Sequence, residues 1–162
     1  HLAATGIDFA VADFAVDVLP FDDASLDVVF AKSVIEHVYD PSWMLGEVRR
    51  VLCPGGLLIV LTPDWPSQIA VFYEDPTHIH PYQTKGLADL LAISGFRQAG
   101  AERFAHHQWL WRPDLAGGLA RGMARLLRLC LGTPAARRLS DLSGVKFIRW
   151  AVELQILGSG RK

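Results

Sequence analysis

The sequence predicts an α/β fold with a mostly parallel β-sheet. Unbroken aliphatic and β-branched runs recur along the chain, which is typical of strands that are covered on both faces. An amphipathic helical pattern with short links joins two of these runs, and strand–helix–strand is the building unit of α/β folds. The 162 residues, of which 51% are hydrophobic and 20% charged, suit one core, so we expect residues 1–162 to form a single domain.

Three short runs predict the first strands. The run "DFAVA" covers residues 8–12 and ends at Asp13. The run "LDVVFA" covers residues 26–31 and ends before Lys32, and "LLIVL" covers residues 57–61. None of the three has a polar face, which favours a buried sheet.

The segment between the second and third runs predicts a helix. Asp40 can cap its N-terminus, and Pro41 fits the first helical position, where no N–H is needed. Pro54, Gly55 and Gly56 would stop the helix and turn the chain into the next strand. One apolar face recurs at helical spacing and consists of Met44, Leu45, Val48, Val51 and Leu52.

The second half of the chain continues the alternation. Thr84 can cap a helix that ends at residues 94–96, and a strand is expected within residues 97–111. Residues 114–132 predict a further helix, loosened by its glycines. Residues 145–157 alternate enough for a long strand near a sheet edge. The inward face of the helix after Thr84 consists of Leu87, Leu90 and Leu91.

Polar or aromatic residues stand where two of the predicted strands end. Asp13 and Phe14 follow the first strand, and Lys32 and Ser33 follow the second. In doubly wound sheets, ligands bind beyond the carboxyl ends of the strands. A carboxylate there can accept a hydrogen bond from an exocyclic amine or a ribose hydroxyl, and an aromatic ring can face a flat base. The alternative, a turn cap at Asp13 and a core role for Phe14, is favoured by spacing alone.

His37 lies about one helical turn beyond the end of the second strand, next to Glu36. An imidazole titrates near neutrality, so His37 can take a proton from a substrate hydroxyl or amine. Glu36 could orient the ring, or could pair with an arginine and have no chemical part. A structural hydrogen bond is the commoner role of such a histidine, so the pair alone is a weak signal.

The segment "YEDPTHIHPY", residues 73–82, holds two further histidines, His78 and His80, beside Glu74 and Asp75. In an extended segment the two rings would share a face, and two imidazoles with a carboxylate can bind zinc or non-haem iron. Contact with an acceptor, and a purely structural role, are the other interpretations. The metal is the least favoured of the three, and no metal site is expected.

A basic amphipathic pattern covers residues 114–131. Such a helix can lie on an anionic membrane or bind a phosphorylated acceptor, whereas a solvated face is the simpler account. No apolar run reaches the ~18 residues of a membrane span. Trp109 and Trp111 could form the floor of an acceptor pocket or simply pack. Stacking on nucleic acid is not expected, because the net charge is −1 and no RNA motif is present. The basic stripe consists of Arg121, Arg125 and Arg128.

The spaced motifs together resemble the second half of a class I S-adenosylmethionine-dependent methyltransferase domain of the small-molecule group. They are "DF", "LPFDDASLDVVFAKSVIEHVYDP", "LGEVRRVLCPGGLLIVLTP" and "LADLLAISGF", and they span roughly residues 8–96. Asp27 stands for the family's strand aspartate and Glu47 and Arg50 for its helix pair, whereas Leu26 replaces the usual Phe. The resemblance implies a Rossmann-like, doubly wound, mostly parallel sheet with an antiparallel last strand, and S-adenosyl-L-methionine as cofactor.

The resemblance also implies roles for individual residues. By position, Asp13 would bond the adenine amine and Phe14 would line the adenine pocket. Lys32 and Ser33 would border the methionine moiety of the cofactor. His37 would lie close to both the cofactor and the mouth of the substrate site.

The resemblance places residues 73–82 in a loop over the active site, where His78 or His80 would contact the acceptor or, like His37, act as base. Residues 112–144 would form a helical lid or insertion. The expected reaction is methyl transfer to an oxygen or nitrogen of a small-molecule acceptor, or of a sugar- or lipid-linked one.

Part of the family pattern is absent. The glycine-rich loop after the family's first strand, and the acidic residue after its second, would both precede His1, so the N-terminal strands are expected to be missing. Those strands would sit between residues 8–12 and residues 26–31, and their absence would expose strand edges. The alternative function is therefore a non-catalytic binding or scaffold domain, or an inactive fragment of the enzyme.

The cysteines and the start of the chain favour a cytoplasmic protein. Cys53 and Cys130 lie far apart without metal-ligand spacing, as expected of reduced thiols. No charged-then-apolar leader follows His1, so no secretory signal is expected.

Overall fold

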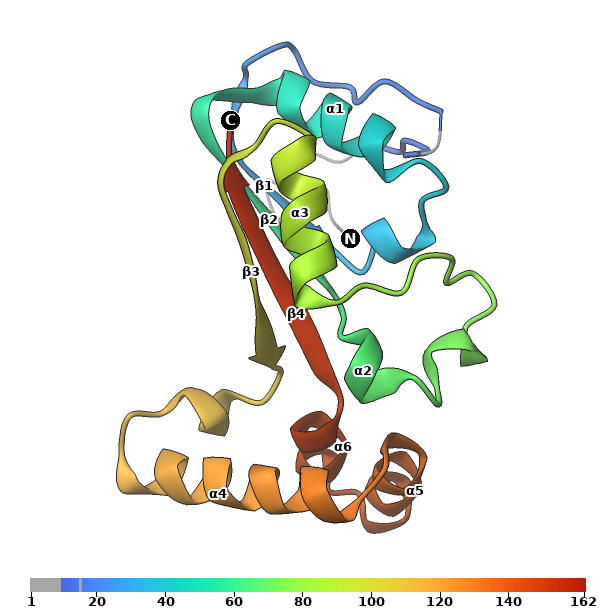
Figure 1. Ribbon diagram of the computed structural model, residues 1–162, viewed down its shortest axis with the longest axis vertical. Coiled ribbons are helices and arrows are strands. Elements are labelled where there is room, and N and C mark those ends of the chain that lie inside the picture. Colours follow the sequence, from blue (N-terminus) through green and yellow to red (C-terminus); the bar gives the residue numbers. More distant parts are fainter. Residues whose placement is uncertain (1–9, 15) are drawn as a thin grey trace.

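The computed structural model describes residues 10–14 and 16–162, and within them four strands form one mixed sheet (Figure 1). The order is β1-β2-β4-β3. β1 pairs with β2 in parallel, whereas β4 is antiparallel to both β2 and β3. Three strands therefore run in one direction and the last is reversed, which confirms the expected α/β sheet with an antiparallel last strand. The strands are β1 (Leu26–Lys32), β2 (Leu52–Pro63), β3 (Arg97–Ala105) and β4 (Leu154–Arg161).

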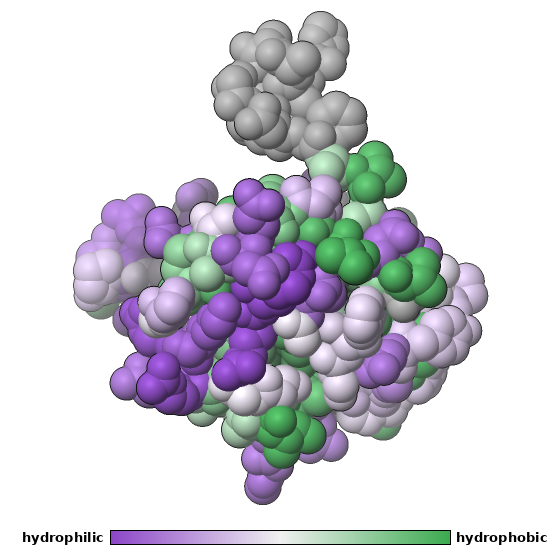
Figure 2. All heavy atoms as spheres, turned by 90° about the horizontal axis from the view of Figure 1, so that it is seen from above, coloured by the Kyte–Doolittle hydropathy of each residue, from purple (hydrophilic) through white to green (hydrophobic). Residues whose placement is uncertain are grey.

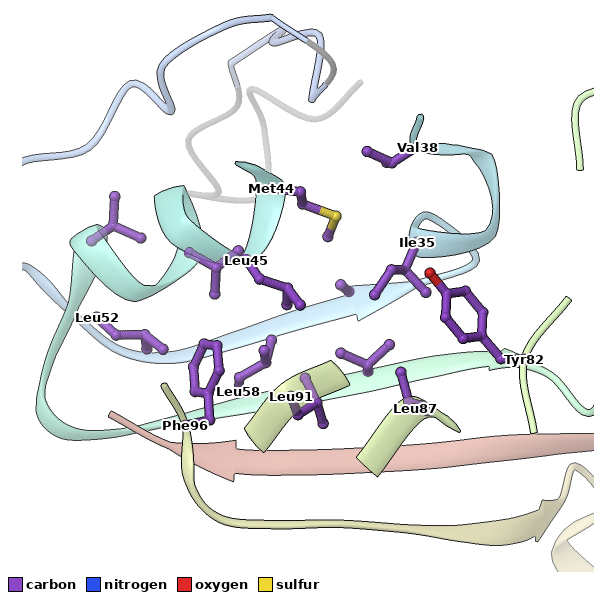
Figure 3. Close-up of a cluster of buried hydrophobic side chains, with 14 of the residues drawn as sticks. Ile35, Val38, Met44, Leu45, Leu52, Leu58, Tyr82, Leu87, Leu91 and Phe96 are labelled. Carbon is purple, nitrogen blue, oxygen red and sulfur yellow. The ribbon is translucent and has the colours of Figure 1, made fainter. Parts of the chain in front are cut away.

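Two helices, α1 (Pro41–Val51) and α3 (Thr84–Ile93), cover one face of this sheet (Figure 1). Their apolar faces meet the sheet in one hydrophobic core, in which the labelled side chains converge between the helices and the strands (Figure 3). Burial of such side chains is the main stabilising term of the fold. The core residues that carry this contact include Met44, Leu45, Val48, Leu58, Leu87, Leu91, Phe96 and Ile156, all at most 4% exposed.

Glycines of β4 let α3 approach the sheet closely. A Cβ atom on Gly158 would lie 2.8 Å from Cδ2 of Leu87, and one on Gly160 would lie 2.7 Å from Cβ of Phe96. Both distances are too short for real side chains, so these two positions need a residue without Cβ. On the opposite face of the sheet, Val28 and Phe30 of β1 are 53% and 58% exposed.

The first predicted helix is confirmed with its cap. Oδ1 of Asp40 accepts hydrogen bonds from the backbone N–H groups of Ser42 (3.0 Å) and Trp43 (3.1 Å). The helix ends at Val51 rather than at Pro54, because β2 already begins at Leu52.

The cap expected at Thr84 is wrong. The helix begins at Thr84 itself, and Gln83 precedes it in an extended conformation without a side-chain cap. Leu87 and Leu91 are fully buried on its inner face as expected, and Leu90 packs against the same core while partly exposed.

The long strand expected over residues 145–157 is also wrong. Residues Lys146–Val152 form helix α6, and β4 starts at Leu154 between β2 and β3 rather than at a sheet edge. The apolar residues of this stretch suit either period, and packing decides between them, since Ala151 and Phe147 join a second small core with α4.

Three helices lie beyond the carboxyl ends of the parallel strands (Figure 1). They are α4 (Leu115–Cys130), α5 (Thr133–Ser143) and α6, and α4 confirms the helix expected over residues 114–132. The opposite end of the molecule, where α1 and the C-terminus lie, is seen from outside in Figure 2, and hydrophilic side chains gather over a broad part of it. The short elements are α2 (Trp65–Gln68) and the 3-10 turns η2 (Ile35–His37), η3 (Phe72–Glu74) and η4 (Gln108–Trp111).

The strand expected over residues 8–12 can be compared with the structure only at residues 10–12. Residues 8 and 9 lie outside the described part of the chain, and residues 10–12 are not in a strand. Within the described sheet β1 is an edge strand, and residues 10–12 do not pair with its open edge.

Candidate functional site

A cavity of about 420 Å³ opens beyond the carboxyl end of β1. It brings together four of the residues singled out in the sequence, namely Asp13, Phe14, Ser33 and His37. The remaining lining is apolar. This agrees with the rule that ligands of such sheets bind beyond the strand ends. The rest of the lining consists of Ala12, Val34 and Val38.

The backbone turns sharply where β1 ends. Ser33 has a φ of 52°, in the left-handed region that residues other than glycine rarely adopt. Its backbone N–H donates a hydrogen bond to the carbonyl of Leu61 (2.8 Å). Backbone strain of this kind is found preferentially at ligand sites. The turn leads directly into η2 and so places His37 on the cavity wall.

Lys32 does not line this cavity. It is the last residue of β1 and exposed, and its positive charge contributes, after burial, to lowering the pKa of His106. The structure therefore separates Lys32 from the four residues that share the cavity.

Glu36 is fully buried beneath the cavity wall. Its Oε2 accepts a hydrogen bond from Oγ1 of Thr62 (2.8 Å), a residue of β2. Its Oε1 is buried without a hydrogen-bond partner among the residues described. Burial, with the negative charge of Glu36 as second cause, raises the pKa of Tyr82. One alternative from the sequence was that Glu36 pairs with an arginine. Within the described part of the chain, Glu36 pairs with no arginine.

His37 is oriented by a hydrogen-bonded chain from the loop after η3. Its Nδ1 lies 2.9 Å from Oγ1 of Thr77 and 3.2 Å from the Thr77 carbonyl, and the Thr77 hydroxyl donates to Oδ1 of Asp75 (2.6 Å). The hydrogen bonds from Thr77 lower the pKa of Asp75. Because the hydroxyl proton of Thr77 goes to Asp75, Nδ1 of His37 is the donor to Thr77. The other ring nitrogen of His37, Nε2, faces Glu36 and lies 4.0 Å from its Oε1.

The loop that carries the other two histidines is held against η2. The backbone N–H groups of Ile79 and His80 both donate to the carbonyl of Glu36, at 2.8 and 3.1 Å. The ring of His78 lies 4.8 Å from that of His37, and its Nδ1 bonds the Phe72 carbonyl at 2.6 Å.

The structure separates His80 from this pair. Nε2 of His80 lies 3.3 Å from the carbonyl of Tyr39, so the shared face expected of His78 and His80 is not formed. Among the residues that the structure describes, the group that could hold a metal ion is instead Glu36, His37 and His78. Glu74, the other expected carboxylate, pairs with Arg137.

Two threonines that no sequence motif singled out order this site. Thr62 and Thr77 are far from Glu36 and His37 along the chain, and a hydroxyl carries no pattern of its own. The one local signal is the Asp75–Thr77 turn, in which the N–H of Thr77 also donates to Oδ1 of Asp75 (2.9 Å).

A second cavity, of about 330 Å³, lies at the end of β3. Its charged lining residues are Arg103, Arg121, Arg125, Arg128 and Glu102. Arg125 and Arg128 form no hydrogen bond or ion pair within the described chain, whereas Arg121 donates to the Arg112 carbonyl (2.7 Å). Burial, and then the charges of Arg125 and Arg103, lower the pKa of Arg128. Trp111 lines the same cavity and packs edge-on against Phe104. An anion would relieve the repulsion among these cations.

The outer side of α4 is apolar and exposed. Together its exposed side chains form one stripe, here called the apolar ridge. A cavity of about 370 Å³ lined almost wholly by apolar groups, including Trp109, adjoins it. Among the helices described, none is long and apolar enough to cross a bilayer. The apolar ridge consists of Leu115, Leu119, Met123, Leu126 and Leu129.

Comparisons with known proteins agree with this arrangement. Residues 1–60 match the family model "Methyltransferase domain". A protein of Mycolicibacterium smegmatis named as a probable S-adenosylmethionine-dependent methyltransferase is 39% identical over 134 residues, which are 79% of this chain and 51% of the relative. A protein of the same description from Mycobacterium tuberculosis is 34% identical over 121 residues, 72% of this chain and 43% of the relative. The chain thus spans about half or less of the length of these relatives.

Solved structures share the fold. A SAM-dependent methyltransferase from Archaeoglobus fulgidus superposes with a TM-score of 0.59 over 98% of this chain and 69% of that one, at 18% identity. At that identity the likeness concerns the fold alone. The Rossmann-like α/β sheet expected from the sequence is confirmed.

Proposed function

This chain belongs to the class I S-adenosylmethionine-dependent methyltransferases, and we propose that the protein transfers a methyl group to an oxygen or nitrogen of an anionic small-molecule or sugar- or lipid-linked acceptor. The observation that carries this proposal is the shared cavity of Asp13, Phe14, Ser33 and His37 at the end of β1. These residues come from two segments that converge where the family resemblance would place the cofactor.

The cavity fits the adenosine half of S-adenosylmethionine. Its walls are apolar, Phe14 offers an aromatic face for adenine, and Asp13 offers a carboxylate that can accept from the adenine amine. When bound, the cofactor supplies a methyl group on a sulfonium, already activated for transfer. Ser33 and His37 would border its other half. Lys32 is the last residue of β1 but does not line the cavity, so we assign it no contact with the cofactor.

A histidine of this site would take the proton of the acceptor. His37 lines the cavity, and His78 lies against it, whereas His80 is directed to the Tyr39 carbonyl. This placement favours His37 or His78 over His80 as base. The remaining task of the protein is to align the acceptor and exclude water, and alignment contributes ~7–11 kcal/mol in favourable cases.

The arginine cavity supports an acceptor with a negative group. Arg103 lies near the carboxyl end of β3, while His37 follows β1, and β2 and β4 lie between these two strands. Three strand spacings amount to about 14 Å. An acceptor that reaches from the arginines to His37 is therefore extended, with its phosphate or carboxylate remote from the atom that is methylated.

The proposed lid covers residues 112–144, which contain the helices α4 and α5. The apolar ridge of α4 favours a lipid-linked acceptor and peripheral contact with an anionic membrane through residues 114–131, because apolar and basic stripes run along the same helix. A cytoplasmic location is part of this proposal, supported by the free thiols of Cys53 and Cys130.

The experiment follows labelled methyl groups. The complete protein is incubated with S-adenosylmethionine labelled in its methyl group and with anionic lipid-linked or sugar-phosphate acceptors. We expect label transfer that falls in Arg125→Ala through a higher KM, and in His37→Ala through a lower kcat with nearly unchanged cofactor affinity. Absence of binding of S-adenosylhomocysteine by the complete protein would favour the rival function, a scaffold domain without catalysis.

A further inference from the structure

Three potential metal ligands converge beneath the wall of the cavity. Glu36, His37 and His78 each offer one ligand atom, and these atoms lie within 4.8 Å of one another. We propose that the three residues bind one divalent transition-metal ion next to the cavity that holds Asp13.

The unpaired oxygen of Glu36 is the first observation behind this proposal. The side chain is fully buried, and its Oε2 is satisfied by Thr62. Its Oε1 faces His37 Nε2 at 4.0 Å, without a hydrogen bond from any residue that the structure describes. Buried carboxylates are normally paired with a cation or coordinate a metal. A cation among these residues would supply the missing partner.

The hydrogen bonds of the two rings are the second observation. Nδ1 of His78 must donate to the Phe72 carbonyl (2.6 Å), because a carbonyl only accepts. Nδ1 of His37 likewise faces the carbonyl and the hydroxyl of Thr77. In the neutral rings both protons are then on Nδ1, and each Nε2 carries a lone pair. Nε2 of His78 also lies 3.9 Å from Oδ2 of Asp75. Metal-binding histidines are held in this way, with the second nitrogen on a carbonyl or carboxylate.

The spacing requires a small contraction. Ligand atoms of a tetrahedral site with bonds of about 2.0–2.2 Å lie roughly 3.3–3.6 Å apart, so the ligand atoms would have to approach one another by up to about 1.5 Å. The backbone bonds of Ile79 and His80 to the Glu36 carbonyl keep the loop close enough for this movement. Two imidazoles and one carboxylate suit zinc, cobalt, manganese or iron better than calcium or magnesium.

The ion would also change the chemistry of the site, a consequence that rests on the proposed function. Three protein ligands leave one position open. His37 lines the cavity as well, so an acceptor hydroxyl there would lie near the ion and lose its proton more easily. In that case His37 and His78 hold the ion, and neither acts as the base. The binding itself does not depend on methyl transfer.

The test measures metal binding on untagged, complete protein that has been freed of metal with a chelator. Zn²⁺ is titrated in competition with a chromophoric chelator, and Co²⁺ is followed by its visible absorption. We expect one ion per chain. Glu36→Gln and His78→Gln should each weaken binding about 100-fold, with circular dichroism unchanged. His80→Gln is the matched control on the same loop, and it should bind Zn²⁺ within about twofold of the parent.

The proposal is overturned if the parent binds no ion more tightly than about 100 μM, or if His80→Gln loses as much affinity as His78→Gln. Binding of S-adenosylhomocysteine is measured on the same metal-free samples. Zinc bound without any cofactor binding would uphold the metal site and contradict the proposed function. Cofactor bound without zinc would do the reverse.

Discussion

The hydroxyl of Thr62 donates a 2.8 Å hydrogen bond to Oε2 of Glu36, and both side chains are fully buried. The bond links the end of β2 to the turn that follows β1. Together with the loop N–H groups on the Glu36 carbonyl, it fixes η2 and thereby the position of His37.

Two substitutions at Glu36 should differ in their effect on stability. In metal-free buffer, Glu36→Gln keeps the volume and an acceptor for Thr62 while removing a buried charge, so we expect a free energy of unfolding within about 1 kcal/mol of the parent or above it. Glu36→Ala leaves the Thr62 hydroxyl unpaired and a cavity behind, at a cost of about 2–4 kcal/mol. Denaturant unfolding measures both, and equal losses would contradict the description of this pair.

Two glycines of α4 should respond to alanine with opposite sign. A Cβ on Gly117 would overlap the carbonyl oxygen of Arg112, whereas Gly122 has open space around it. We expect Gly117→Ala to destabilise by about 1–3 kcal/mol and Gly122→Ala to stabilise by about 0.5–1 kcal/mol. Thermal unfolding of the two variants checks this, and stabilisation by both would mean that residue 112 does not pack on the first turn of α4.

Arg50 and Glu47 of α1 should make stability depend on acid pH. Arg50 donates to the carbonyls of Leu19 and Phe21 (both 3.0 Å) and to Asp23, and the Leu19 N–H donates to Glu47. The hydrogen bond from Arg50 is the main cause that lowers the pKa of Glu47. The stabilisation is therefore complete above pH 4.5, the ordinary value, and is lost as the pH falls through the lower folded value.

The variant Glu47→Gln tests that dependence. It should lose about 1–3 kcal/mol at pH 7 and show a shallower loss below pH 4.5 than the parent. Asp23→Asn is the control, since that carboxylate is 79% exposed and its ion pair contributes at most about 1 kcal/mol. Parallel pH profiles of Glu47→Gln and the parent would exclude Glu47 as the titrating group.

The apolar ridge of α4 should promote binding to anionic membranes. Leu119→Glu and Met123→Glu add charge to the exposed ridge, and we expect each to lower partitioning onto phosphatidylglycerol vesicles about tenfold. Ile93→Glu, at a still more exposed site on α3, should leave partitioning unchanged. Co-sedimentation measures the effect. If the parent stays in solution, or if Ile93→Glu lowers binding equally, the membrane contact is wrong.

Local signals in the sequence were sufficient for part of the fold. Asp40 and Pro41 mark the start of α1 because a cap acts within one turn, and the apolar runs mark β1 and β2. Residues 145–157 could not be assigned in the same way. Their apolar spacing suits both periods, and only the contact of Phe147 and Ala151 with α4 selects a helix.

In the candidate site, too, some features could be expected from the sequence and others could not. The sequence led us to expect Asp13 and His37 to converge, through the rule for strand ends. The structure places both on one cavity, although residues 10–12 are not in a strand. The burial of Glu36 could not be expected in this way, because acidic residues are rarely enclosed. Its partner Thr62, and the partner Thr77 of His37, come from distant segments that only the folded chain brings near.

The proposed function requires that a carboxylate at the tip of one segment and an imidazole after the next strand share a cofactor pocket. Calorimetric titration of the complete protein with S-adenosylhomocysteine tests this requirement, comparing the parent with Asp13→Ala and with Asp22→Ala, an exposed control outside the cavity. We expect Asp13→Ala to weaken binding about 10- to 100-fold with an unchanged melting temperature, and Asp22→Ala to bind like the parent. Equal affinity of all three proteins would remove Asp13 from the cofactor site and contradict the shared pocket.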